Sequence, residues 1–273
     1  MKKPIQKSLG ISLVAVCVLC GSSQAKADID TIRNSNSEIW GSAGTSLLNY
    51  NEDISTPNIP DSEHGWTPSL AVGVDYMGSR NLYFALEGSV AFGNDNYNGS
   101  LYDQNTGNYD IPYQSTTHET ITNVDGKFGK GFALSNIVML TPYVELGFRY
   151  WERNLGGGDV EDYQNFDTLG GLMFQIAPTN RLILTAYGSA GTTFAASMKA
   201  NVTGDTYDLG SAGMYKVGGK IGYDLTQRLE LFTTLDYDAF RYGQSPLQAD
   251  GTLEPSSHTE DTTLRVGLGY HFR

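Results

Sequence analysis

Cysteine is almost absent from this 273-residue sequence, and the two cysteines, Cys17 and Cys20, lie close to the N-terminus. Residues 1–27 combine early lysines, an apolar run over 11–19 and small residues at 25–27. This order is typical of a secretory signal peptide, and the apolar run is too short to cross a bilayer. We therefore predict cleavage before Asp28, in preference to a lipid anchor on Cys20. The mature chain would then have no disulfide and no thiolate metal site.

Basic residues are also scarce, with 18 Lys and Arg against 30 Asp and Glu and a formal net charge of −12. Residues 1–27 contain four lysines and no acid, so their removal changes the net charge to −16. A phosphate backbone needs a basic face, which excludes nucleic acid as a natural partner. The sequence also has no Gly-x-Ser-x-Gly elbow, phosphate-binding loop or metal-ligand cluster. We therefore predict no enzyme, no catalytic residue, no metal and no cofactor.

Glycine and aromatic residues are abundant instead, with 32 Gly, 17 Tyr and 11 Phe. This composition favours many strands and turns over helices. Apolar residues alternate with a period of two in about ten segments, most clearly in "LYFALEGSVAF" at 82–92 and in the terminal "LRVGLGYHFR" at 264–273. The candidate strand at 118–134 fits less well, because Lys130 falls on its apolar face.

The connections between these segments alternate between short and long. The short ones lie near 78–81, 135–136, 178–181 and 226–228, and the long ones near 51–66, 93–116, 153–162, 199–211 and 243–257. Short turns at one end and long loops at the other are typical of an outer-membrane barrel. We predict a closed antiparallel transmembrane β-barrel of about ten strands, with eight or twelve as alternatives, over residues 38–273. A short periplasmic segment, 28–37, would precede it.

Polar residues on the opposite face of the strands indicate that the apolar face meets lipid and the polar face meets the lumen. The residues predicted to line the lumen are Glu145, Arg149, Lys216, Lys220, Asp236, Asp238 and Arg265. A three-residue turn at 226–228 would place Lys216 opposite Asp238 and Asp224 opposite Glu230. If Phe272 were level with Leu229, Asp236 would lie opposite Arg265. Two alternatives stay open: these side chains fill a narrow lumen, or they tune an ion path.

The terminal strand resembles the closing strand of Gram-negative outer-membrane β-barrel proteins, the broad porin-like family, as does "LTPYVELGFRYW" at 140–151. In that family the alternation ends on an aromatic residue, whereas here Arg273 follows Phe272. The resemblance implies an outer-membrane location in the cell envelope, reached through the periplasm. It implies contact with outer-membrane lipid and lipopolysaccharide, and with the barrel-assembly machinery through the C-terminal strand. It carries no chemistry.

The long loops hold many acids and almost no bases, which predicts a solvated acidic crown outside the membrane. Within it, "GGGDVED" at 156–162 lacks the spaced ligands of a calcium loop, and we interpret it as flexible. The tyrosine-rich tract 96–113 is open to two interpretations. It either contacts an extracellular partner or extends the barrel wall above the membrane.

An outer-membrane hydrolase of the omptin type would need acids paired with one another and with a histidine at the outer mouth. His258 and Glu260 share a strand face, whereas His118 and Glu119 cannot. His64 is a further candidate. We expect a non-enzymatic barrel with a structural or surface-interaction role. A narrow cation-preferring porin or channel is the alternative, and a hydrolase is third.

Overall fold

The computed structural model describes residues 27–54, 58–249 and 251–272 of the chain. That part of the chain contains one helix and twelve strands. They are α1 (Ile29–Ser35), β1 (Glu38–Glu52), β2 (Ser62–Met77), β3 (Leu82–Asp103), β4 (Asn108–Lys130), β5 (Phe132–Ser135), β6 (Val138–Gly156), β7 (Asp159–Ile176), β8 (Leu182–Ala200), β9 (Thr206–Asp208), β10 (Gly213–Asp224), β11 (Leu229–Tyr242) and β12 (Ser257–His271).

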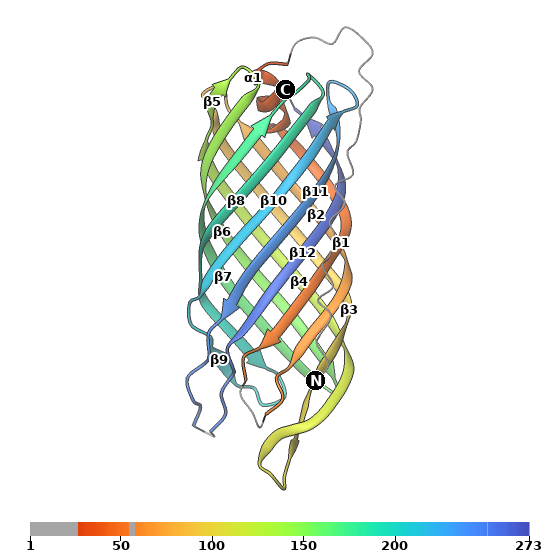
Figure 1. The fold of residues 1–273 in the computed structure, drawn as a ribbon, viewed down its shortest axis with the longest axis vertical. Helices are drawn as coiled ribbons and strands as arrows, with labels where there is room; N and C mark the ends of the chain where they lie inside the picture. The colour runs from red at the N-terminus through yellow and green to blue at the C-terminus, as the bar shows by residue number, and fades with distance from the viewer. Residues whose placement is uncertain (1–26, 55–57, 250, 273) are drawn as a thin grey trace, which may run out of the picture.

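Ten of these strands form one closed antiparallel barrel (Figure 1). β1 pairs with β12, which joins the first and last strands, and β8 pairs with β10. The short strands β5 and β9 lie off the ring and pair with β6 and β8. Closure gives every strand of the ring two partners, which hydrocarbon requires because it offers no hydrogen bonds to a free edge. The prediction of a closed barrel of about ten strands is confirmed.

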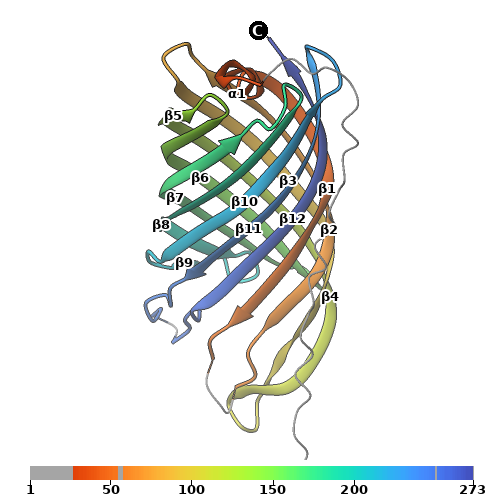
Figure 2. The same ribbon diagram turned by 45° about the horizontal axis from the view of Figure 1, so that its top comes forward.

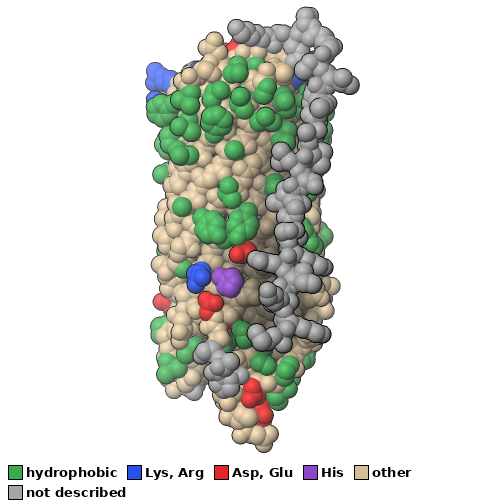
Figure 3. All heavy atoms as spheres, in the orientation of Figure 1, with side chains coloured by type: hydrophobic (Ala, Val, Ile, Leu, Met, Phe, Trp, Pro, Cys, Tyr) green, Lys and Arg blue, Asp and Glu red, His purple; other side chains and the backbone are tan. Residues whose placement is uncertain are grey.

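A belt of apolar side chains surrounds the barrel toward the end that carries the short turns. On the face drawn in Figure 3, hydrophobic side chains gather toward that end, where a few charged side chains lie at the rim, and a histidine and most of the acidic side chains lie toward the other end. So large a contiguous apolar surface needs lipid as its solvent. Exposed members of the belt include Leu70, Val72, Phe84, Leu86, Val124, Phe128, Val144, Leu146, Leu172, Phe174, Val217, Ile221, Leu231, Leu235, Leu264, Val266 and Leu268.

The two ends of the barrel differ as predicted from the lengths of the connections. Short connections at 78–81, 136–137, 177–181 and 225–228 lie at the top of Figure 1, together with α1 and the end of β12. This is the periplasmic end of an outer-membrane barrel. At the opposite, extracellular end the strands extend farther beyond the apolar belt, and the β3–β4 hairpin extends farthest (Figure 2).

Two of the predicted long loops are strands in the structure. The tract 93–116 continues β3 and β4 as one hairpin, closed by the turn at 104–107. The segment 153–162 continues β6 and β7 up to a tight turn at Gly157 and Gly158, whose φ angles of 65° and 93° suit glycine. The expectation of a flexible loop there is therefore wrong. Strand pairing persists beyond the membrane because polar side chains on both faces tolerate water.

The helix α1 lies in the periplasmic mouth of the barrel (Figure 2). Asp28 caps it by accepting hydrogen bonds from the backbone N–H groups of Asp30 (2.9 Å) and Thr31 (3.2 Å). Ile32 is fully buried in the barrel end. Within the described residues, no helix has the length and apolar character needed to cross a membrane. The predicted signal peptide lies outside the described residues except for Ala27.

Candidate functional site in the barrel lumen

The seven residues predicted to line the lumen all border one or both of two small internal cavities. The cavities have volumes of about 100 and about 80 Å³ and lie side by side, since they share lining residues. Lys220 borders the first cavity, Asp236 and Arg265 border both, and the second cavity is bordered by Glu145, Arg149, Lys216 and Asp238. Alternation brings these charges inward, because the neighbours of each residue on its strand face lipid.

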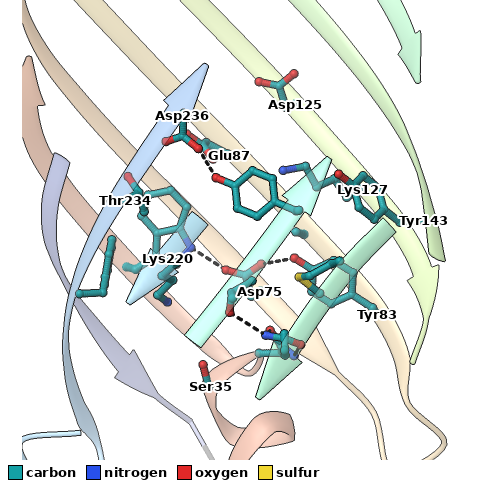
Figure 4. Close-up of a pocket in the computed structure, with 18 of the residues that line it drawn as sticks. Ser35, Asp75, Tyr83, Glu87, Asp125, Lys127, Tyr143, Lys220, Thr234 and Asp236 are labelled. Atoms are coloured by element: carbon teal, nitrogen blue, oxygen red, sulfur yellow. Dashed lines mark hydrogen bonds between the residues drawn. The ribbon is translucent and has the colours of Figure 1, made fainter. Parts of the chain in front are cut away.

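The first cavity lies toward the periplasmic end and is lined by hydrogen-bonded acids (Figure 4). Asp75 accepts hydrogen bonds from Trp40 Nε1 (2.7 Å) and from the Tyr83 hydroxyl (2.8 Å). Tyr187 donates a hydrogen bond to Asp236. These bonds fix the orientation of the carboxylates along the cavity wall.

Lys216 occupies the centre of a group of three carboxylates. Its Nζ atom is 2.8 Å from Asp125 Oδ1, 2.7 Å from Glu145 Oε1 and 4.0 Å from Asp167 Oδ1. Lys216 is level with Asp238 on β11, as the sequence predicted. Its shortest ion pairs are nevertheless with acids on β4 and β6, on other parts of the barrel wall. The long lysine side chain therefore contacts distant acids in preference to its register partner.

Arg265 and Asp236 form an ion pair, but not in the predicted register. Leu229 pairs with Tyr270, whereas the prediction aligned it with Phe272, so the expected register is wrong by two residues. The register differs because the C-terminal end of the chain extends beyond Leu229, the first residue of β11, whereas the prediction ended both strands at the same level. Arg265 Nη2 still lies 3.6 Å from Asp236 Oδ2, because diagonal neighbours on a sheet remain within reach of long side chains.

Arg149 closes the second cavity on its extracellular side. Its Nη1 atom is 2.8 Å from Asp261 Oδ2, and its guanidinium lies over the Phe240 ring at 5.1 Å. Both partners of the ion pair are buried. Charge and aromatic surface therefore meet in the same layer of the lumen.

Two apolar clusters bracket the charged layer. The periplasmic cluster contains Ile32 of α1 together with Met77, Met139, Met173 and Ala177, all of them buried. The extracellular cluster contains Tyr50, Trp151, Tyr163, Phe240 and Tyr242 among other buried residues. Its rings pack tightly, with 4.9 Å between the centroids of Trp151 and Tyr163. Buried side chains therefore occupy the lumen on both sides of the charged layer.

Beyond the extracellular cluster, Arg153 gathers three acids that the sequence placed in a solvated crown. Its Nε atom is 2.7 Å from Glu63 Oε1, and its Nη1 atom is 2.8 Å from Glu161 Oε2. Asp61 is more distant, at 3.9 Å from Nη2. Glu63 and Arg153 are almost fully buried. Part of the predicted acidic crown is therefore buried in the extracellular mouth of the barrel, because β2, β6 and β7 extend beyond the apolar belt.

Acids at this mouth outnumber bases, which affects their protonation. Burial, followed by the charge of Asp61, raises the pKa of Glu52 to about 8. Burial and the charge of Glu161 raise the pKa of Glu254 well above its ordinary value, against a hydrogen bond from Tyr163. Burial and the neighbouring negative charges therefore favour the neutral form of these carboxyl groups.

The histidines considered for hydrolysis do not face the lumen. His258 and Glu260 share a face, as predicted, but it is the outer face, and His258 Nδ1 lies 3.8 Å from Asp53 Oδ1. His64 and His118 also lie on the outer face, bonded to Asn49 and Asn94. The structure therefore does not assemble them with the inward acids.

Several lumen residues were missed by sequence reasoning, although strand parity could have found them. On β4 the outward Val124 and Phe128 imply that Asp125 and Lys127 point inward. Lys130, which weakened the prediction of this strand, points outward next to the periplasmic turn, where its ammonium can reach water. Parity does not reveal which inward charges meet.

No family model matches the sequence, and no curated protein matches it. The crystal structure of the outer membrane protease OmpT from Escherichia coli matches with a TM-score of 0.61 and 10% identity, over 87% of this chain and 98% of that chain. Ail, the attachment invasion locus protein of Yersinia pestis, matches with a TM-score of 0.32 and 12% identity, over 87% and 99%. At 10% identity, the likeness to OmpT shows the fold alone.

The closed ring, the apolar belt and the likeness in fold agree with the terminal strand pattern. Each of the first two is a requirement of a hydrocarbon environment, since backbone groups must pair and outward side chains must be apolar. The chain has the fold of an outer-membrane β-barrel protein.

Proposed function

We propose that this protein is a non-conducting, non-enzymatic barrel that presents an extracellular binding surface. The observation that carries the proposal is the filling of the lumen. Buried apolar clusters lie at both ends of a charged layer, and the two internal cavities beside its charges have volumes of about 100 and about 80 Å³. A filled lumen supports a function outside the barrel.

The β3–β4 hairpin is the best candidate for that surface. Its outer part exposes large side chains far from lipid, which on a soluble surface indicates a contact site. Tyrosine adds contact area at low entropic cost. The exposed members are Leu101, Tyr102, Tyr109, Ile111 and Tyr113.

One edge of the hairpin supports a specific mode of binding. Residues 108–117 of β4 pair with β3, but pairing with β6 begins only at His118. Within the described residues, contacts from the β1–β2 connection reach this stretch at Tyr109, which bonds to Asn58 and Ile59. Unpaired strand edges accept an added strand. The tract 93–117 contains three acidic residues, among them Asp95, and no Lys, Arg or His. A positively charged extended segment therefore fits this edge best.

Planar-bilayer recording of the refolded mature chain tests the filled lumen. We expect no discrete conductance steps. A double variant, Trp151→Ala with Tyr163→Ala, removes two rings from the extracellular cluster and serves as the matched control. If opening the lumen produces conductance steps, they should appear in this variant and not in the unmodified barrel. Steps of similar size from the unmodified barrel would contradict the proposal.

Replacing residues 100–112 with Asn-Gly tests the hairpin. Gly99 and Tyr113 are register partners, so a two-residue turn can join them without disturbing the barrel. A fluorescent peptide of alternating Lys and Val should bind the full-length hairpin at least tenfold more tightly than the shortened one. A peptide of alternating Glu and Val is the control. Equal binding to both barrels would contradict the assignment of the surface.

A narrow cation path is the second candidate, supported by the charge of the second cavity. Seven carboxylates and four bases line it. Asp236→Asn and Lys216→Met should then change ion selectivity in opposite directions. This candidate requires steps from the unmodified barrel, so the same recording decides between the two.

A further inference from the structure

We propose that Glu38, Glu230 and His271 form a binding site for a divalent cation of the Zn²⁺ class. Each offers one ligand atom, and these atoms lie within 4.8 Å of one another. All three side chains are at least 98% buried. Ligands around a tetrahedral Zn²⁺ ion lie about 3.5 Å apart, so a small closure of the side chains suffices. Sequence reasoning did not predict this site, because the three residues are far apart in the chain.

With its proton on Nε2, His271 would direct the lone pair of Nδ1 at the carboxylates. Its Nε2 atom is 2.9 Å from Asp224 Oδ1, which favours a proton on Nε2. Its Nδ1 atom has no hydrogen-bond partner and lies 3.7 Å from Glu38 Oε2, which has none either. A carboxylate behind a histidine ligand is the usual arrangement that orients imidazole toward a metal.

Two glycines make room for the carboxylates. A Cβ atom at Gly269 would lie 1.8 Å from Glu38 Oε2, and one at Gly222 would lie 2.7 Å from the Glu230 carboxyl carbon. Any larger residue at either position would displace a proposed ligand. The site is therefore a shaped cradle and not a chance cluster of acids.

Lys220 already forms ion pairs with two of the three proposed ligands. The ion would bind the ligand atoms that Lys220 does not contact. The Lys220 Nζ atom lies 2.6 Å from Glu38 Oε1 and 2.6 Å from Glu230 Oε1. Two carboxylates contact this ammonium and a third, that of Asp224, contacts His271, so negative charge is in excess around His271. The group around Lys216 differs, because its three acids are arranged around the ammonium and no imidazole is present.

The position suggests what the ion would do. Glu38 begins β1, Glu230 lies at the start of β11 and His271 ends β12. An ion held by all three would join the first strand to the last two at the periplasmic end. It would stabilise the seam at which the barrel closes, because a ligand that binds only the folded state shifts the folding equilibrium.

Titration calorimetry of the refolded mature barrel with Zn²⁺ tests the site. We expect one ion per barrel, and a rise in Tm of about 5–10 °C at 100 times Kd. His271→Ala and Glu230→Gln should weaken binding by at least tenfold, and Asp224→Asn by about 10- to 100-fold. His258→Ala, at a partly exposed histidine on the outer face at the opposite end of β12, should leave binding unchanged. No binding by the unmodified barrel, or undiminished binding by His271→Ala, would overturn the proposal.

X-ray absorption of the Zn²⁺-loaded, unmodified barrel keeps the test decisive if a variant does not fold. One nitrogen ligand with oxygen ligands is expected, and the predicted mature chain has no sulfur ligand from cysteine. An all-oxygen shell, or a shell with several histidines, would show that the ion is bound elsewhere and would refute the assignment.

Discussion

Lys216 Nζ on β10 lies 2.7 Å from Glu145 Oε1 on β6, although neither strand pairs with the other. The bond crosses the lumen and ties together parts of the wall that the sheet does not connect directly. It shows that the interior charges act as internal braces, in agreement with a filled lumen.

Lys216→Met should destabilise the barrel by about 3 kcal/mol. The change leaves Asp125 and Glu145 without their cation in a buried layer, and removing one partner of a buried pair has an effect of this size. Urea unfolding in lipid vesicles measures it. Lys130→Met, at an outward lysine, is the control and should change stability by less than about 0.5 kcal/mol. Equal effects would show that the bridge does not stabilise the fold.

The extracellular mouth should lose stability as the pH rises through 8. The pKa of Glu52 is about 8 in the folded protein against an ordinary 4.5, so between these values the folded state keeps a proton that the unfolded chain releases. The contribution of Glu52 to the free energy of unfolding is complete below pH 4.5 and is lost above pH 8. Between these values the free energy of unfolding falls by up to about 1.4 kcal/mol per pH unit.

Melting curves between pH 5.5 and 8.5 check this dependence. Glu52→Gln should flatten the decline, whereas Asp208→Asn, at an exposed position on β9, should leave it unchanged. A decline that is identical in the Glu52 variant would assign the effect to other groups.

Ile32→Ala should destabilise the barrel by about 2–4 kcal/mol, because Ile32 is fully buried where α1 enters the periplasmic cluster. Thermal unfolding in detergent measures the change. Ile39→Ala provides the comparison, since Ile39 is 58% exposed on the outer face. A smaller loss from Ile32→Ala than from Ile39→Ala would mean that α1 is not a structural part of the barrel end.

The seam between β1 and β12 can be tested with cysteines, because the predicted mature chain has none of its own. Ser46 and Thr263 are register partners, with their hydroxyl oxygens 2.8 Å apart. Ser46→Cys with Thr263→Cys should form a disulfide on oxidation, seen as a shift in gel mobility. Ser46→Cys with Thr259→Cys, four residues away, should not. Cross-linking of the second pair would indicate a different register.

The outward and inward faces of the strands could be predicted from local sequence. A period of two places Leu264, Val266 and Leu268 on one face and Arg265 on the other, whatever the partners of the strand. The same parity places His258 and Glu260 outward with Leu264, so the sequence contained the argument against a catalytic pair in the lumen.

The strand pattern, the lipid-facing belt and most of the inward charges could therefore be predicted, because they depend on local alternation. The contrast between short and long connections follows from the spacing of the alternating segments. Which charges meet depends on the tertiary structure. Arg265 does meet Asp236, but in a register two residues away from the one that predicted this pair. The pair Lys216 with Glu145 and the group of Glu38, Glu230 and His271 depend on ring closure and strand stagger. These are set by the packing of the whole barrel, because a shift of two residues in register keeps every side chain on its own face while changing its neighbours.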